Sequence, residues 1–117
     1  MSSIIGQIKI STFENLGLPN RIEEDILVGE QNLRHMMTSH PEDFNRFKFH
    51  IREIICHPDY VNLKKDKSIQ FIKRIDPDIV LVAVATSNNG YWYARTIYCI
   101  TQQKFDQYLV SGYLKNP

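Results

Sequence analysis

The sequence predicts an α+β domain in which N-terminal helices precede a twisted antiparallel β-meander and a C-terminal helix. Helix-type apolar spacing is concentrated in residues 30–57, strand-type segments occupy residues 68–100, and a last amphipathic segment covers residues 101–111. Segregation of helices from consecutive strands is typical of α+β folds. With 117 residues, the chain can bury one core and form one site.

Residues 1–25 are expected to form an N-terminal extension, and residues 26–117 the single domain. In the extension, the alternation of Ile8 and Ile10 indicates a strand, whereas Ile5 and its apolar successors also fit a helical stripe. Both structures therefore remain open for this segment.

Two helices are predicted at the start of the domain. Over about residues 30–38, the 100° step of an α-helix places Asn32 and His35 on a polar side, opposite an apolar one. Pro41 suits the first turn of a second helix, in which apolar residues recur at core spacing until Pro58 ends it.

Three strands are predicted in the second half of the chain. They cover residues 68–75, 78–86 and 91–100. The links between them are short, which makes an antiparallel meander the economical topology. The middle strand is apolar on both parities and should be central. A closing helix over about residues 101–111 begins at Thr101 and ends at Gly112.

Composition excludes several classes of protein. With 43% hydrophobic and 23% charged residues, the chain resembles ordinary soluble proteins, and no apolar run reaches the roughly 18 residues of a membrane span. No signal peptide is evident, so a cytoplasmic protein without membrane contact is expected. Cys56 and Cys99 form no CxxC set, which argues against a zinc site or a disulfide framework. No GxGxxG, P-loop, HExxH or GxSxG motif is present, and neither cofactor nor metal is expected.

Charge is distributed unevenly along a chain whose net charge is +1. Acidic residues dominate between residues 14 and 30, whereas cations dominate between residues 63 and 74. These cations are Lys64, Lys65, Lys67, Lys73 and Arg74, opposed only by Asp66. A basic end of this kind can meet phosphates. The alternative is a solvated loop tip, since short lysine runs are common there.

The histidines suit metal-free phosphodiester cleavage. RNA cleavage at its own 2′-hydroxyl needs a base, an acid for the leaving 5′-oxygen and cations around the transition state, but no metal. Histidine suits either proton-transfer role because free imidazole titrates near neutrality. His40, at the joint of the two predicted helices, is the leading candidate, and His35 is its counterpart. A structural histidine is the competing interpretation for each, and the preferred one for His50 and His57.

The alternation of side chains along a strand limits which cations can share one face of the sheet. Lys73 and Arg74 point to opposite sides of a regular strand, and so do Arg95 and Thr96. Arg95 lies among aromatic residues, where a guanidinium needs an anion or a stacking partner, and a structural ion pair is the alternative. Thr96 can offer a hydroxyl to phosphate. Tyr98 can stack a base, although aromatic residues in strands more often pack in cores or at edges.

Several fragments of the chain, taken in order, resemble a known family. They are VGEQNLRHM, SHPEDF, IICHPDYV, SIQFIKR, VLVAVATSNNGYWYARTIY and SGYLK, within about residues 26–115. Together they are similar to the phage-associated members of the barnase, EndoU, colicin and RelE-like nuclease superfamily. The resemblance implies a small barnase- or RelE-like domain that cleaves RNA without a metal. Such domains look like toxins or effectors of phages and mobile elements, held in check by a partner protein.

The resemblance also implies which polar positions matter. They are Asn32, His35, His40, Lys73, Arg95, Thr96 and Tyr98, with Thr96 at a place where a serine is common. The first 25 residues have no firm counterpart in the family.

We therefore expect an endoribonuclease that leaves a 2′,3′-cyclic phosphate. The expected catalytic residues are His40, His35, Lys73, Arg95 and Thr96, with Lys73 and Arg95 as a phosphate clamp. The expected substrate-binding residues are Asn32, Tyr98, Arg74 and Lys67. The expected partners are RNA and a cognate antitoxin or immunity protein. The alternatives are a catalytically silent RNA-binding domain and a protein-interaction module of a phage or mobile element.

Overall fold

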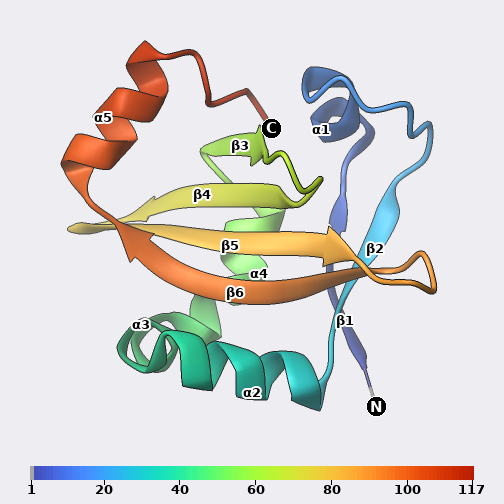
Figure 1. Cartoon of the computed structure of the whole chain (residues 1–117), viewed down its shortest axis with the longest axis horizontal. Helices are drawn as coiled ribbons and strands as arrows, with labels where there is room; N and C mark the ends of the chain where they lie inside the picture. The colour runs from blue at the N-terminus through green and yellow to red at the C-terminus, as the bar shows by residue number, and fades with distance from the viewer. Residues whose placement is uncertain (1) are drawn as a thin grey trace.

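A six-stranded sheet in the order β1-β2-β6-β5-β4-β3 organises residues 2–117, which the computed structural model describes. The strands are β1 (Ser3–Ile8), β2 (Glu24–Val28), β3 (Tyr60–Leu63), β4 (Ile69–Ile75), β5 (Asp78–Thr86) and β6 (Trp92–Ile100). Neighbours pair antiparallel except β2 and β6, which run parallel over a short stretch. Figure 1 shows the curled meander of β4, β5 and β6, with β1 and β2 crossing beside one end of it. The α+β class is confirmed.

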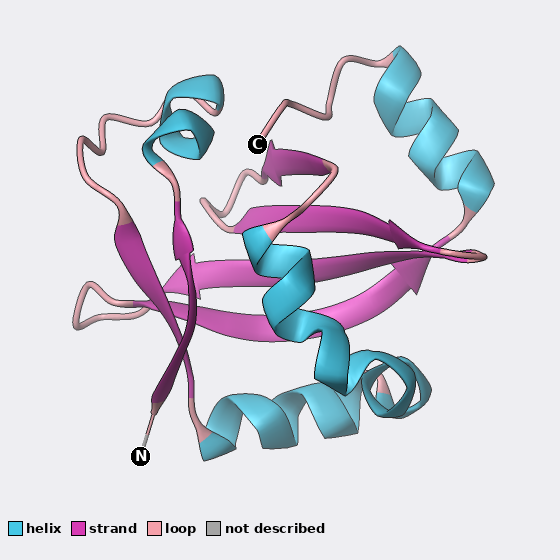
Figure 2. Ribbon diagram, turned by 180° about the vertical axis from the view of Figure 1, so that it is seen from behind, coloured by secondary structure: helices cyan, strands magenta, loops and turns pink. Residues whose placement is uncertain are grey.

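The helices lie on different sides of this sheet. They are α1 (Ile10–Asn15), α2 (Glu30–Ser39), α3 (Pro41–Phe47), α4 (Ile51–Cys56) and α5 (Gln102–Val110), with a 3-10 turn, η1 (Lys48–His50), before α4. In Figure 2, α4 crosses in front of the strands. Figure 1 shows α2 running along the β6 side of the sheet, and α5 at the far end of the meander.

The main core lies between the sheet and α4. Phe71, Val82 and Ile97 project from adjacent strands toward this side, where Ile54 of α4 meets them, and all four are fully buried or nearly so. Burial of apolar side chains from both layers is the dominant stabilising term for such a packing.

The opposite face of the meander is only partly covered. We call it the Tyr98 face, and it carries Asn62, Gln70, Ala83, Thr96 and Tyr98 on adjacent strands. A smaller apolar cluster covers one end of it, where Phe105 of α5 packs near Ile72 and Leu81. Among the described residues, no helix crosses the middle of this face in Figure 1.

Most predicted elements are present, with one break. The helix predicted over residues 30–38 is α2, and the three predicted strands are β4, β5 and β6. A single helix from Pro41 to Pro58 is wrong, because η1 separates α3 from α4. Phe47, just before η1, has φ −120° and ψ 6°, outside the helical region. The bend lets α3 contact β6 while α4 crosses one face of the sheet. Both helices therefore contribute side chains to the main core.

The N-terminal residues form part of the same sheet. β1 pairs with β2, and β2 pairs with β6 at Ile26 and Leu27. Phe13 of α1 is fully buried, and its ring centroid lies 6.1 Å from that of Trp92. The two patterns left open for this segment therefore occur one after the other, as a strand and then a helix.

The meander and its closing helix follow local rules. The strand β5 lies between β4 and β6 and is largely buried, as predicted from its apolar residues on both faces. Thr101 caps α5, since its Oγ1 accepts a hydrogen bond from the Lys104 N–H at 3.1 Å. Gly112 follows α5 with φ +73°, which ends the helix as expected. Within residues 2–117, no helix is both long and apolar enough to cross a membrane.

Candidate functional site

Helix α2 runs beside β6 and in the same direction. Gly29, at the start of α2, lines the same pocket as Tyr93 near the start of β6. His40, at the end of α2, contacts Tyr98 further along the strand. β2 pairs only with the first two residues of β6, Trp92 and Tyr93. The rest of that edge of β6 is therefore free to contact α2 and α3. Side chains from the helices therefore meet side chains from β6 along one line.

The next contact along this line joins α3 to β6. The Asp43 carboxylate Oδ2 accepts a hydrogen bond from the Cys99 backbone N–H at 2.9 Å. The Cys99 N–H faces the edge of β6 that has no neighbouring strand at this point within residues 2–117, and the Asp43 carboxylate supplies the acceptor that a strand would otherwise provide. Burial raises the pKa of the Cys99 thiol to about 11, and the adjacent Asp43 carboxylate adds to the shift. The thiol therefore stays protonated at neutral pH.

The imidazole of His40 stacks on the phenol ring of Tyr98. Their centroids are 4.9 Å apart, and the ring planes differ by 27°. His40 both ends α2 and precedes α3, with φ −142° and ψ 69°, so it lies at the joint as predicted. Both rings are half-buried, and Thr96 lies two residues earlier on the same face. The stack therefore holds the His40 imidazole where solvent and a ligand can reach it.

Two buried amides adjoin this stack, and sequence reasoning missed both. Asn62 donates through Nδ2 to Gln70 Oε1 at 2.7 Å, and Gln70 Nε2 donates to Tyr98 Oη at 3.4 Å. Each amide is only 2% exposed. Gln70 stands between Ile69 and Phe71 in an otherwise apolar strand, which is a signal that could have been noticed. Asn62 lies in β3, a strand that was not predicted.

A second feature, the Arg95 pocket, lies further back along β6. Its volume is about 800 Å³. Its lining includes Gly29, Asn32, His35, Ser87, Tyr93 and Arg95. Asn32 also caps α2, because its Oδ1 accepts a hydrogen bond from the Gly29 N–H at 2.8 Å. The structure thus divides the predicted residues between two neighbouring places: Asn32, His35 and Arg95 at this pocket, and His40, Thr96 and Tyr98 at the ring stack.

Arg95 occupies a β-bulge. The register shifts between Ala83 and Val84, so that Thr96 pairs with Ala83, Ala94 pairs with Val84, and Arg95 has no partner of its own. A bulge places two residues of one strand opposite one of the other, which removes the strict alternation assumed for Arg95 and Thr96. Arg95 is exposed and donates to the Thr86 carbonyl at 3.1 Å. Within residues 2–117 it forms no ion pair.

Lys73 and Arg95 do not form the predicted clamp. Lys73 pairs with Val80, whose side chain lies in the main core, so Lys73 is on the α4 side of the sheet. Its Nζ donates to the His57 carbonyl at 2.7 Å, at the end of α4. Strand alternation is the reason, because Lys73 has the opposite parity to Gln70 and Ile72 on the Tyr98 face.

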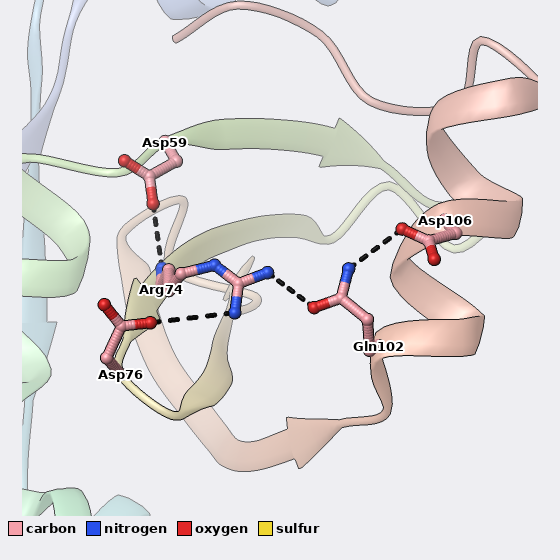
Figure 3. Close-up of polar contacts among 5 residues, drawn as sticks. All are labelled: Asp59, Arg74, Asp76, Gln102 and Asp106. Carbon is pink, nitrogen blue, oxygen red and sulfur yellow. Dashed lines mark hydrogen bonds and ion pairs between the residues drawn. The ribbon is translucent and has the colours of Figure 1, made fainter.

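Arg74 reaches the Tyr98 face but at its covered end. Figure 3 shows its guanidinium between Gln102, which accepts a hydrogen bond at 2.6 Å, and Asp76, which lies 3.8 Å away. Its backbone N–H donates to Asp59 Oδ2 at 2.8 Å. The same picture shows Gln102 donating in turn to Asp106. These contacts tie β4 to α5, far along the sheet from the Arg95 pocket, and engage part of the guanidinium.

Lys67 lies at the tip of the β3–β4 hairpin. It is exposed and has φ +73°, an uncommon backbone conformation for a residue other than glycine. Hydrogen bonds from the Ser68 hydroxyl and N–H lower the pKa of Asp66 in the same turn. The turn fits the alternative of a solvated tip, although its cations remain available to a long substrate.

The described residues offer no ready metal centre. Within residues 2–117, no group of three or more His, Cys, Asp or Glu side chains is placed to hold a metal ion. The polar groups gathered at β6 are instead imidazole, phenol, hydroxyl, amide and guanidinium.

Fold and site together define a small α+β protein with a histidine–tyrosine stack and, beside one edge of its sheet, an arginine that forms no ion pair within residues 2–117. Residues 3–107 match the family model described as phage-Barnase-EndoU-ColicinE5/D-RelE like nuclease3. The chain belongs to this phage-associated nuclease-like family, which confirms the resemblance identified in the sequence. The match begins within β1, and so includes the N-terminal segment that the sequence fragments left out. Comparisons with curated proteins and with solved structures give no match.

Proposed function

We propose that the chain is an endoribonuclease that cleaves RNA without a metal ion, through attack of the 2′-hydroxyl and formation of a 2′,3′-cyclic phosphate. The observation that carries the proposal is the stack of His40 on Tyr98. Tyr98 lies on the same strand as Arg95, which forms no ion pair within residues 2–117. Family membership supports a nuclease. The particular chemistry rests on the side chains at β6, because function belongs to the site rather than to the fold.

His40 is the proposed general base or general acid. Its ring is oriented by Tyr98 and remains partly exposed, so a phosphodiester on the Tyr98 face can come within hydrogen-bond distance of it. Cleavage requires two proton transfers, one from the 2′-hydroxyl and one to the 5′-oxygen. His35, exposed in the Arg95 pocket, is the proposed second proton carrier.

Arg95 is the proposed source of charge stabilisation. A guanidinium presents a planar fork of donors that fits two phosphate oxygens. Arg95 uses one donor group for the Thr86 carbonyl, and no carboxylate of residues 2–117 pairs with it. Thr96 can add a hydroxyl from the Tyr98 face, and Asn32 can bind an adjoining part of the RNA at the pocket. Lys73 has no role in this proposal.

The proposal is tested by incubating the purified chain with total RNA in EDTA and analysing the new ends. His40→Ala and Arg95→Ala are the test variants. His57→Ala and Arg52→Ala are matched controls, because His57 is an exposed histidine after α4 and Arg52 is an exposed arginine of α4 that donates to the Ile4 carbonyl. We expect cyclic phosphate ends from the wild type and both controls, and a large loss in both test variants.

Other results point elsewhere. Cleavage that appears only with added magnesium would contradict the metal-free mechanism. RNA that stays intact across a range of pH, yet binds the chain, would favour the catalytically silent RNA-binding domain. Equal losses in His40→Ala and His57→Ala would indicate a folding effect rather than a catalytic one.

A toxin or effector role, with a cognate antitoxin or immunity protein as partner, is part of the same proposal. It predicts that induced expression of the wild-type chain arrests growth of a bacterial host, whereas induced His40→Ala does not. Growth unaffected by an active nuclease would contradict this role without contradicting the chemistry.

A further inference from the structure

Asn62 and Gln70 form a buried polar pair on a face where apolar side chains could be buried at a lower cost in free energy. Each is 2% exposed, and the two belong to adjacent strands in direct register. Burying an amide costs free energy unless its donors and acceptors are matched. Within residues 2–117, no buried side-chain nitrogen or oxygen lacks a hydrogen-bond partner. Asn62 Nδ2, Gln70 Oε1 and Gln70 Nε2 each have a partner, and the partner of Gln70 Nε2 is Tyr98.

The order of donors and acceptors gives this network a direction. Asn62 Nδ2 donates to Gln70 Oε1 at 2.7 Å, which engages that oxygen. The NH2 group of Gln70 then faces Tyr98 Oη at 3.4 Å. A tyrosine hydroxyl has one hydrogen and can also accept. If Oη accepts from Gln70, its own hydrogen is free to be donated to another group. At 3.4 Å the contact is long, so it biases the direction of donation without holding the ring, which stacks on His40.

The register explains how the phenol reaches the amide. Ala83 of β5 pairs with Gln70 on one side and with Thr96 on the other. Its small side chain leaves space above β5 for the Tyr98 hydroxyl to approach Gln70. The His40 ring covers the Tyr98 ring on the side of α2. The phenol is thus oriented by an amide at its hydroxyl and by an imidazole at its ring.

We infer that Gln70 is a positioning residue that turns the Tyr98 hydroxyl into a hydrogen-bond donor for a phosphate oxygen bound beside His40. This inference rests on the proposed function and deepens it, since it names Tyr98 Oη as a group that binds the scissile phosphodiester. A neutral donor aimed at a developing negative charge stabilises the transition state of such a reaction. Gln70 itself touches no substrate and acts through Tyr98.

Replacement of Gln70 by Glu tests the direction of donation with almost no change of shape. A carboxylate at this position accepts from Asn62 on one oxygen and from the Tyr98 hydroxyl on the other. The hydroxyl hydrogen then points into the protein, and the phosphate loses its donor. In the reverse network, with both amides turned over, Tyr98 already donates to residue 70 in the wild type. Gln70→Glu would then leave the affinity for phosphate nearly unchanged.

The measurement is the affinity for a 2′-O-methyl RNA oligonucleotide, which lacks a free 2′-hydroxyl and cannot be cleaved by this route. We expect Tyr98→Phe and Gln70→Glu each to weaken binding by about tenfold, as the loss of one hydrogen bond to a charged group does. Gln70→Glu in a Tyr98→Phe background is the control for the added negative charge, because a loss that remains there does not act through the hydroxyl. Wild-type affinity for Gln70→Glu, or an equal loss from Gln70→Glu in the Tyr98→Phe background, would overturn the inference.

A second variant covers the case in which a buried carboxylate prevents folding. Gln70→Met keeps the length of the side chain and removes both hydrogen bonds. It should weaken binding in the wild-type background but add nothing to Tyr98→Phe, because both changes remove the same interaction. Additive losses, or no loss in either background, would overturn the inference. Thermal unfolding of each variant checks that the fold is retained.

The outcome for the nuclease is read separately. A wild-type chain that binds the oligonucleotide but leaves ordinary RNA intact would refute the proposed cleavage, while the Gln70 variants still decide the inference. If Gln70→Glu cleaves RNA as well as the wild type does, the inference is refuted and the proposed function is not. A wild-type chain with no affinity for the oligonucleotide also overturns the inference, since the Tyr98 hydroxyl would have no phosphate to meet.

Discussion

The Asp43 carboxylate accepts a hydrogen bond from the Cys99 backbone N–H at 2.9 Å, and this contact fixes the start of α3 against the edge of β6. Asp43 lies in the first turn of α3, directly after the joint at His40. Cys99 directly follows Tyr98 on the strand. The hydrogen bond and the stack of His40 on Tyr98 therefore join the same joint between α2 and α3 to neighbouring residues of β6.

Removal of the Asp43 side chain should loosen both contacts. In Asp43→Ala the half-buried N–H of Cys99 loses its acceptor, which is expected to lower the free energy of unfolding by about 1–3 kcal/mol. Asp43→Asn keeps a carbonyl oxygen and should be closer to the wild type, and Glu42→Ala, an exposed neighbour, is the control. Urea unfolding and RNA cleavage measure the two effects. Unchanged cleavage in a destabilised Asp43→Ala would show that this bond does not position His40.

Cys99 should react slowly with alkylating agents. Burial raises the pKa of its thiol from 9.0 to about 11, and only the thiolate is nucleophilic. At a pH of about 8 the thiolate fraction is then lower by about 100-fold than for an ordinary thiol. In a Cys56→Ser chain, where Cys99 is the remaining thiol, iodoacetamide should modify the folded protein far more slowly than the same chain unfolded in urea. Similar rates would contradict the assignment.

The same pKa predicts how stability depends on pH. The folded state holds the Cys99 proton more tightly than the unfolded state, so this contribution to stability is complete below the unfolded pKa of 9.0. It is lost as the pH rises toward the folded value of about 11. The free energy of unfolding should therefore fall more steeply in this window for the wild type than for Cys99→Ala. Parallel curves would be evidence against it.

Lys73→Met should leave RNA cleavage unchanged. The Lys73 ammonium donates to the His57 carbonyl on the α4 side of the sheet, and methionine preserves most of the aliphatic stem. Any effect should appear in thermal unfolding, because the C-terminal carbonyl of α4 loses a donor. Cleavage assays beside Arg95→Ala decide the matter, and a loss as large as that of Arg95→Ala would restore Lys73 to the site.

Arg95→Ala should change how RNA binding depends on salt. Each phosphate neutralised on a single strand contributes about 0.7 to the slope of log affinity against log salt concentration. If Arg95 contacts one phosphate, its removal should reduce the slope by about that amount. Arg52→Ala, on α4, should leave the slope as it is. Equal slopes for the wild type and Arg95→Ala would place the guanidinium away from the RNA backbone.

Gly6→Ala should destabilise the fold. A Cβ at this position in β1 would lie 2.8 Å from Ile55 Cγ2 and 3.3 Å from Cys56 Sγ, so the Ile55 side chain or α4 itself would have to shift. Overpacking of this kind typically costs about 1–3 kcal/mol. Ser3→Ala, an exposed position in the same strand, is the control. Equal melting temperatures for Gly6→Ala and the wild type would mean that α4 and β1 accommodate a methyl group.

The sequence determined the features that depend on local spacing. Alternation and short links were sufficient for β4, β5 and β6, because residues at i and i+2 share a face wherever the strand pairs. Helical spacing and Pro41 located the joint at His40. Thr101 and Gly112 bounded α5, because a cap and a positive φ act within one turn. The order of motifs was also sufficient to identify the family.

Only the tertiary structure decided which of these side chains meet. The bulge at Arg95 depends on how β5 and β6 pair, so the parity of an isolated strand could not reveal it. Lys73 was separated from Arg95 because its side chain lies on the α4 side of the sheet, where it meets the His57 carbonyl, and a charge pattern does not reveal which side α4 covers. The contact from Gln70 to Tyr98 joins the β3–β4 hairpin to β6, across 28 residues of sequence. Contacts of this kind arise from long-range packing, and a residue's own neighbours along the chain carry no record of them.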